Sequence, residues 1–151
     1  MRVYVAGSFK NAEMVREIGK MIRSCGYEAY VFCDTGERTY DLSQQFRTQY
    51  DLSTVTPNLV YQIPELYHIG IRNLDELTQC DALVLVLPCG RSAHLEAGWM
   101  VGRGRPVYAV GPMVKGEFDA MYVMMNGIFD IMQLDALMRT IARDEVLRRE
   151  L

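Results

Sequence analysis

Apolar residues follow two different spacings along this chain, and the two alternate in a way that predicts a repeating order of strands and helices. Short runs rich in strand-forming residues predict strands at 3–6, 28–33, 82–87, 106–110 and 127–131. Apolar residues at helical spacing predict helices over 11–25, 69–79, 92–103 and 134–149. This order predicts an α/β fold with a doubly wound, parallel five-stranded sheet, flavodoxin-like or Rossmann-like.

The run ALVLVL at 82–87 is apolar at every position, which is typical of a central parallel strand buried on both faces. Ligands of doubly wound sheets bind beyond the carboxyl ends of the strands, where the strand order reverses. The loops after the first strand (7–9) and after the central strand (89–92) are therefore expected at one edge, beside a ligand.

The stretch from about 40 to 68 has the least regular pattern, with two prolines and several tyrosines. It predicts a helix followed by a long loop. Long loops in compact domains commonly form lids or binding segments, so we expect this stretch at the mouth of a site.

Length and hydropathy favour one soluble domain over residues 1–151. With 50% hydrophobic and 23% charged residues the composition is ordinary for a soluble protein, and no apolar run has the length of a membrane span. The first residues have strand character without the features of a signal peptide, so they are expected to belong to the fold.

Charge and cysteine content exclude further classes of function. A net charge of -3 argues against binding to polymeric DNA or RNA, which requires a basic surface. The four cysteines form no Cys-x-x-Cys pair and only two histidines accompany them, so neither a structural zinc site nor another metal is expected. Free thiols favour a cytoplasmic location.

The loop that follows the central strand has features of an anion site. Pro88 ends the strand, and Ser92 is the predicted N-cap of the next helix. Unpaired N–H groups in the first helical turn bind anions, and Arg91 adds a positive charge. Turns between strands and helices also contain Gly and Ser for purely conformational reasons, so the loop alone leaves ligand binding open.

Glu96 is the one acidic residue between Asp81 and Glu117, and its neighbours in the helix are apolar. With Ser92 as N-cap, Glu96 lies one residue too late for a capping box. We expect the helix start and the nearby arginine to keep this glutamate ionised, which suits a nucleophile better than a proton donor. The alternative is a surface glutamate stabilised by the helix dipole.

Three segments carry a resemblance to a known family: VYVAG at 3–7, NLDELTQCDALVLVLP at 73–88 and HLEAGWMVGRGRPVYAV at 94–110. The chain resembles the nucleoside 2-deoxyribosyltransferases and their relatives, the deoxynucleoside 5'-monophosphate N-glycosidases. The likeness follows the order of elements over most of the chain and is specific in the first strand and from about 73 to 110.

The resemblance implies a role for each matching residue. Glu96 would attack C1' of the sugar and form a glycosyl-enzyme. The residues expected to hold the 5' end of the sugar or its phosphate are Gly90, Arg91 and Ser92, and those expected to line the sugar and base pocket are Tyr4, Gly7, Ser8 and Phe9. The substrate would be a small nucleoside or nucleotide, with no cofactor.

One position departs from the family pattern. Where relatives carry an aspartate that assists at the sugar and in proton transfer, this chain has Asn73, which cannot supply a proton. Either Asp75 or His94 takes over, or the leaving base departs easily, or the chain keeps the pocket without the reaction. The family has Asp or Ser at the position of Gly90, so substrate identity stays open.

A carboxylate nucleophile divides cleavage of an N-glycosidic bond into two displacements. Water as the second acceptor gives a hydrolase and a second base gives a transferase. The alternatives are a nucleotide-binding sensor or regulatory module without turnover and a nicotinamide-dinucleotide glycohydrolase. A dehydrogenase is disfavoured because AGSF replaces the Gly-x-Gly-x-x-Gly turn.

The resemblance also implies a homo-oligomer with sites near a subunit interface, completed by Asp119 and Tyr122. The methionines around Tyr122 fit an adaptable base pocket, a subunit contact or flexible core packing. His94 precedes Glu96 by two residues and therefore projects about 200° away around the helix, without direct contact.

Overall fold

The computed structural model describes residues 1–35, 58–113 and 119–150. The described strands are β1 (Arg2–Ala6), β2 (Glu28–Val31), β3 (Ala82–Val86), β4 (Val107–Val110) and β5 (Gly127–Phe129). They form one parallel sheet in the order β2-β1-β3-β4-β5, which confirms the predicted α/β fold. β5 lies at one edge of the sheet.

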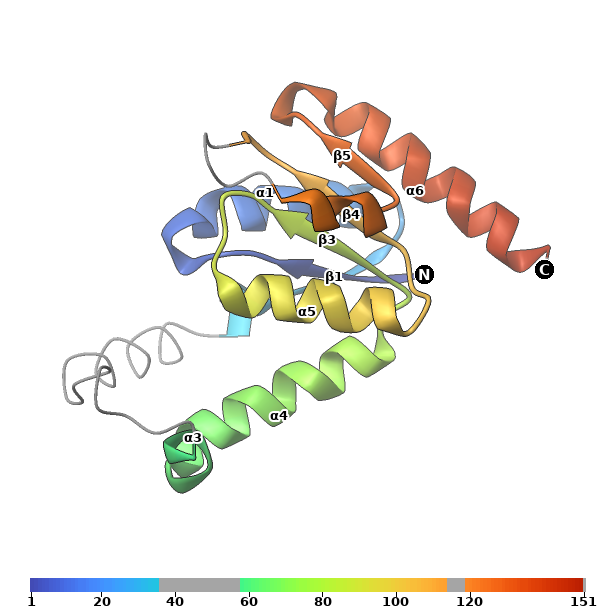
Figure 1. The fold of residues 1–151 in the computed structure, drawn as a ribbon. Helices are drawn as coiled ribbons and strands as arrows, with labels where there is room; N and C mark the ends of the chain where they lie inside the picture. Colours follow the sequence, from blue (N-terminus) through green and yellow to red (C-terminus); the bar gives the residue numbers. More distant parts are fainter. Residues whose placement is uncertain (36–57, 114–118, 151) are drawn as a thin grey trace.

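The described helices are α1 (Ala12–Ser24), α3 (Leu59–Gln62), α4 (Pro64–Gln79), α5 (Arg91–Gly102) and α6 (Leu134–Arg149). Short 3-10 turns η1 (Phe9–Asn11), η2 (Phe32–Thr35), η3 (Ala120–Met124) and η4 (Ile131–Gln133) connect the elements. Figure 1 shows α4 and α5 together on one face of the sheet, with α1 and α6 on the other.

Successive side chains of β1 point to opposite faces of the sheet and pack against different helices. Val3 and Val5 join α1 and α6 in one apolar cluster. Tyr4 and Ala6 point the other way and pack with α4 and α5 in a second cluster. Every residue of β3 is buried, as expected of a strand with helices on both of its faces.

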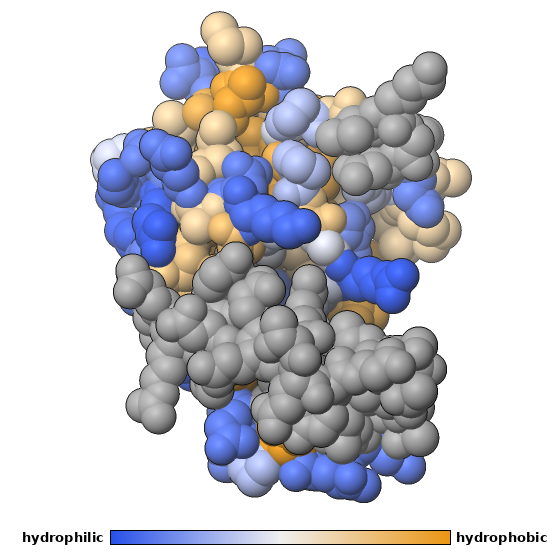
Figure 2. All heavy atoms as spheres, turned by 90° about the vertical axis from the view of Figure 1, so that its left-hand side faces the viewer, coloured by the Kyte–Doolittle hydropathy of each residue, from blue (hydrophilic) through white to orange (hydrophobic). Residues whose placement is uncertain are grey.

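The strand order places the reversal between β1 and β3. From β1 the chain passes to β2 on one side, and β3 then pairs with β1 on the other side. The strands run toward the left of Figure 1, and Figure 2 views that carboxyl edge directly, where hydrophilic and apolar side chains are interspersed. This is the edge at which such sheets bind ligands.

The irregular stretch was predicted incorrectly where it is described. Residues 36–57 lie outside the described part of the chain. From residue 58 the chain forms α3 and then α4, and α4 begins at Pro64 rather than at residue 69. A single residue, Ile63, separates the two helices, so the predicted long loop is not found there. Proline suits this first helical position because its missing N–H would have no partner there.

Candidate active site

Glu96 lies in the second turn of α5, and its side chain reaches back to β1. The hydroxyl of Tyr4 donates a hydrogen bond of 3.0 Å to Glu96 Oε1. Tyr4 is fully buried in the cluster beneath α5, with its ring against Tyr30 at 5.0 Å between centroids. Two residues separated by 92 positions in the sequence thus form one acid–phenol pair, in which Tyr4 is buried and Glu96 is half-buried.

The environment of Glu96 favours its neutral form. Burial raises the pKa of this carboxyl to about 7, and the hydrogen bond from Tyr4 lowers the pKa by a smaller amount. Burial and the adjacent carboxylate also raise the pKa of the Tyr4 phenol, so this phenol remains a proton donor in the pair. With a pKa of about 7, Glu96 is not held fully ionised at neutral pH in the free chain, which differs from the expectation from the sequence.

The start of α5 differs from the predicted one. The helix begins at Arg91 with Gly90 as its N-cap, so Ser92 is not the cap, and no side chain caps the helix. Gly90, Arg91 and Ser92 are exposed. Glu96 lies six residues after the cap, beyond the first turn in which the helix dipole acts. Gly90 has no side chain to cap the first N–H groups of α5, and no capping bond is found within the described residues.

The turn after β1 lies beside the loop that follows β3, as predicted. The side-chain amide of Asn11 donates a hydrogen bond of 3.2 Å to the carbonyl of Leu87 and ties the two loops together. Ser8 Oγ accepts a hydrogen bond from the backbone N–H of Lys10 at 3.2 Å. Phe9 packs edge-on against Phe32 at 4.8 Å.

Gly7 has a packing reason as well as its predicted place at the site. A Cβ at this position would lie 2.6 Å from a methyl group of Val15 in α1, closer than packed carbon atoms approach each other. Gly7 therefore lets α1 approach the end of β1. Ser8 and Phe9 are half-buried, with Gly7, at the carboxyl edge of the sheet.

Asn73 and Asp75 lie on different sides of α4. Asn73 is half-buried and shares a helix face with Leu77, which packs in the same cluster as Tyr4. Asp75 is exposed and projects about 200° away from Asn73. Among the described residues Glu96 has one hydrogen bond, the one from Tyr4, so neither Asn73 nor Asp75 is joined to it directly.

His94 and Tyr122 form a second pair on another side of α5. His94 Nδ1 lies 3.0 Å from the carbonyl of Gly90, and His94 Nε2 lies 2.9 Å from the hydroxyl of Tyr122. Because a carbonyl only accepts, Nδ1 carries a proton, and in the neutral imidazole Nε2 then accepts from the Tyr122 hydroxyl. The two rings stack with 5.9 Å between centroids. The predicted absence of contact between His94 and Glu96 agrees with this arrangement, and Tyr122 does not join Glu96 within the chain.

The methionines around Tyr122 line a mostly apolar cavity of about 300 Å³ between α5 and η3. Met121 and Met124 are exposed, whereas Tyr122 is buried. At the far end of α5, the guanidinium of Arg103 lies 4.7 Å from the centre of the Trp99 ring. In the described ranges no three His, Cys, Asp or Glu side chains are arranged to hold a metal ion, and none of the helices there has the length and apolarity to cross a membrane.

Comparison with solved structures identifies the fold. A 2-deoxyribosyltransferase from Bacillus psychrosaccharolyticus superposes with a TM-score of 0.54 at 14% sequence identity, covering 85% of this chain and 85% of that one. This chain has the 2-deoxyribosyltransferase fold. The CMP N-glycosidase BcmB from Clostridium botulinum also matches, at 14% identity, with 94% of this chain and 98% of that chain covered and a TM-score of 0.48. No protein-family model and no curated protein matches the sequence.

Within the 2-deoxyribosyltransferase fold, the sequence did not predict the bond from Tyr4 to Glu96 or two further contacts. The bond from Asn11 to Leu87 joins residues 76 positions apart, and the contact of His94 with Tyr122 joins residues 28 apart. Asn11 carried a weak signal, because an asparagine at a helix start commonly binds nearby backbone. Nothing in the local pattern indicated the partner of His94.

Proposed function

We propose that this chain cleaves the N-glycosidic bond of a nucleoside or nucleoside 5'-monophosphate, or transfers its sugar, through Glu96 as nucleophile. The observation that carries the proposal is the Glu96–Tyr4 pair, in which a single carboxylate is fixed by a buried phenol at 3.0 Å. The shared fold with a 2-deoxyribosyltransferase supports the same reaction class.

The proposed reaction has two displacements. In the first, the Glu96 oxygen not bonded to Tyr4 attacks C1', the C1'–N bond breaks, and its electron pair leaves with the base, which takes up a proton. In the second, water or another base attacks C1' and gives up a proton to solvent, the bond between C1' and the Glu96 oxygen breaks, and the carboxylate is released. The Tyr4 hydroxyl fixes the orientation of the carboxylate during both steps.

The 5' group of the substrate would lie at the start of α5. Among the residues that the structure describes, no side chain caps this helix, which favours anion binding by its first N–H groups. Arg91 is exposed at the first helical position. These features favour a 5'-monophosphate over an unphosphorylated nucleoside.

Which substrates the chain can cleave depends on whether a side chain can protonate the leaving base. Asp75 is exposed on the outer side of α4, and both ring nitrogens of His94 have partners away from Glu96. Neither residue is therefore placed to replace the acid that Asn73 lacks. The proposal favours a base that leaves readily, or one protonated by water.

A nucleotide-binding module without turnover is the second candidate function. Asn73 is the observation that favours it, because an amide at this position can hold a sugar hydroxyl but cannot protonate a base. Both candidates use the same residues, so only turnover distinguishes them.

The deciding experiment incubates the protein with a panel of nucleosides and their 5'-monophosphates and measures free base by chromatography. Release by the wild type that Glu96→Gln loses and Asp75→Asn retains would support the enzyme. Binding of a nucleotide without release would favour the module. Equal release by wild type and Glu96→Gln would exclude Glu96 as nucleophile. Adding a second base tests for transfer.

We also propose a homo-oligomer with the site near a subunit interface. Leu95 on α5 is 75% exposed, and Val123 and Met121 on η3 are 85% and 57% exposed. Such apolar side chains on neighbouring elements favour a protein contact. Light scattering after size exclusion measures the mass, and Leu95→Glu should shift it toward the monomer, whereas Arg139→Glu on α6 should not.

A further inference from the structure

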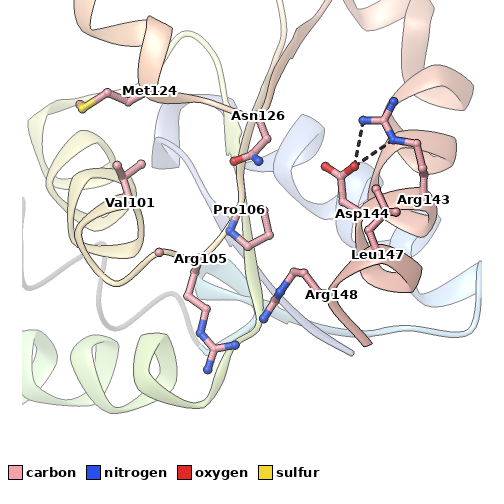
Figure 3. Close-up of a pocket in the computed structure, with 10 residues that line it drawn as sticks. Val101, Arg105, Pro106, Met124, Asn126, Arg143, Asp144, Leu147 and Arg148 are labelled. Carbon is pink, nitrogen blue, oxygen red and sulfur yellow. Dashed lines mark hydrogen bonds and ion pairs between the residues drawn. The ribbon is translucent and has the colours of Figure 1, made fainter. Parts of the chain in front are cut away.

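A second cavity, of about 530 Å³, lies at the opposite edge of the sheet from the start of α5. Figure 3 shows it between the end of α5, the residues that lead into β4 and the second half of α6. Its size is within the range of small-molecule sites. Glu96 is not part of the lining of this cavity, and the proposed function assigns the cavity no role.

Two arginines of this cavity are fixed by one residue. Arg105 Nη1 lies 3.5 Å from Asp81 Oδ1, and Arg148 Nη1 donates a hydrogen bond of 2.8 Å to the backbone carbonyl of Asp81. The other carboxylate oxygen of Asp81 accepts from the backbone N–H of Arg2 at 2.9 Å, which holds Asp81 in place. Arg148 thus uses one N–H donor on Asp81, whereas Arg105 contacts Asp81 only through an ion pair, and both guanidiniums keep further N–H donors.

The cavity has more donors than acceptors. Asp144 is its one lining carboxylate, and that group already accepts from Arg143 at 2.8 Å and from the Tyr108 hydroxyl at 2.9 Å. Asn126 turns its side-chain oxygen to the backbone N–H of Val107, at 3.1 Å, so its amide nitrogen remains as a further donor. Asp144 pairs with Arg143 and Asp81 pairs with Arg105, so the three guanidiniums leave about one net positive charge at the cavity, on a chain whose net charge is -3.

Apolar walls accompany these donors. Val101 and Met124 lie on one side of the cavity, Pro106 at its base and Leu147 on α6 opposite (Figure 3). Leu147 is 52% exposed and Met124 is 43% exposed, so both have apolar surface available to a ligand. An inorganic anion would leave that surface in water.

We propose that this amino-edge cavity binds a phosphate monoester with an apolar or aromatic body, its phosphate between Arg105 and Arg148 and its body against Leu147 and Met124. Planar guanidiniums bind phosphate through paired N–H donors, and prior fixation by Asp81 reduces the conformational entropy lost on binding. The site is separate from the proposed active site, so its test is independent of Glu96.

The test is a titration of isotope-labelled protein with phenyl phosphate, followed by NMR. We expect shifts of the Gly104 amide, the Asn126 side-chain amide and the Arg105 Nε–H signal, and at least tenfold weaker binding of inorganic phosphate. If only the amides of Gly90 to Ser92 shift, the anion binds at the start of α5 and the amino-edge proposal is overturned. Absence of any shift at millimolar probe overturns it as well.

Matched variants on α6 locate the site. Leu147→Glu adds a carboxylate to the cavity and should weaken phenyl phosphate at least tenfold, whereas Val146→Glu adds the same charge to a residue that is 56% exposed and outside the lining. Arg148→Gln should weaken binding at least fivefold, and Arg139→Gln, also on α6, should leave it unchanged. All four positions are exposed, so the variants should fold, and circular dichroism checks this. Equal affinities within each pair would refute the assignment.

Discussion

At the scale of single residues, the protonation of Glu96 should make stability and activity respond to pH in opposite directions. Burial raises the pKa of this carboxyl from 4.5 to about 7, so the folded chain binds the proton more tightly than the unfolded chain does. The free energy of unfolding should therefore fall as pH rises from about 4.5 to about 7, by at most about 3 kcal/mol. Ionised nucleophile, and with it kcat/KM, should rise over the upper part of this range.

Urea unfolding of wild type and Glu96→Gln between pH 4.5 and 8.5 measures the first effect. Glutamine stays neutral, so the two proteins should have similar stability near pH 4.5 and the variant should be the more stable at pH 8. Glu13→Gln, at an exposed position of α1, serves as control and should follow the wild type. Parallel curves for wild type and Glu96→Gln would show that the carboxyl is not buried in solution.

Tyr4→Phe should move the pH dependence of activity upward. The phenol's hydrogen bond lowers the pKa of Glu96, so its loss should raise that pKa further and leave less ionised nucleophile at pH 7. Loss of the bond should cost about 1–2 kcal/mol of stability. The measurement is the midpoint of kcat/KM against pH.

Tyr108→Phe is the matched control for that experiment. Tyr108 is also a buried strand tyrosine, and its hydroxyl donates to Asp144 at 2.9 Å. Its loss should cost a similar amount of stability and leave the pH midpoint of activity unchanged. If both variants move the midpoint equally, the shift reflects general loosening rather than the contact with Glu96.

The sequence singled out Glu96 as a candidate but did not indicate the environment of its side chain. Glu96 was conspicuous because its neighbours in the sequence are apolar, whereas its raised pKa comes from burial in the fold. The error came from treating Arg91 as a neighbour in space. Five residues along a helix correspond to about 140° of rotation, which turns the arginine away from the carboxyl. Burial by elements distant in the sequence, and to a smaller extent the bond from Tyr4, sets the pKa of Glu96, and the local pattern reports neither.

At the scale of elements, two glycines predict opposite effects of the same substitution. Gly98 lies within α5, and a Cβ added there would meet no atom within 4 Å, so Gly98→Ala should stabilise by about 0.5–1 kcal/mol. Gly111 follows β4 with φ of +131°, and a Cβ there would lie 2.4 Å from the carbonyl oxygen of Leu87. Gly111→Ala should destabilise by about 2 kcal/mol or more.

Thermal or urea unfolding of both alanine variants measures this contrast. The comparison also tests whether the end of β4 lies against the loop that leads to the proposed site. A Gly111→Ala protein as stable as wild type would mean that this close approach of the backbone is not maintained in solution.

Elements with a strong period were predicted to within a few residues, and weakly periodic ones were not. One side of α1 is buried, which gives its sequence a helical spacing of apolar residues. All of β3 is buried, which gives a continuous apolar run typical of a central strand. The start of α4 has mainly exposed residues, so burial imposed no pattern there and the helix was predicted to begin too late.

At the scale of the whole molecule, Asp81 joins parts of the chain that are far apart. Asp81→Ala removes the bond to the Arg2 backbone and the ion pair with Arg105, and should lower the free energy of unfolding by about 1–2 kcal/mol. Asp75→Ala, an exposed aspartate on α4, should change it by less than about 0.5 kcal/mol. Urea unfolding compares the two, and equal effects would contradict a linking role for Asp81.

Those links also bear on the route by which the chain reaches its final form. The bonds of Asp81 to Arg2 and Arg148 span 79 and 67 residues. Strand β1 pairs with β2 on one side and can pair with β3 on the other side only after β3 has been synthesised. During synthesis β1 therefore pairs on one side at most until more than half of the chain has emerged from the ribosome. Closing such long loops is entropically costly, so refolding should be slower than that of a helical bundle of equal length.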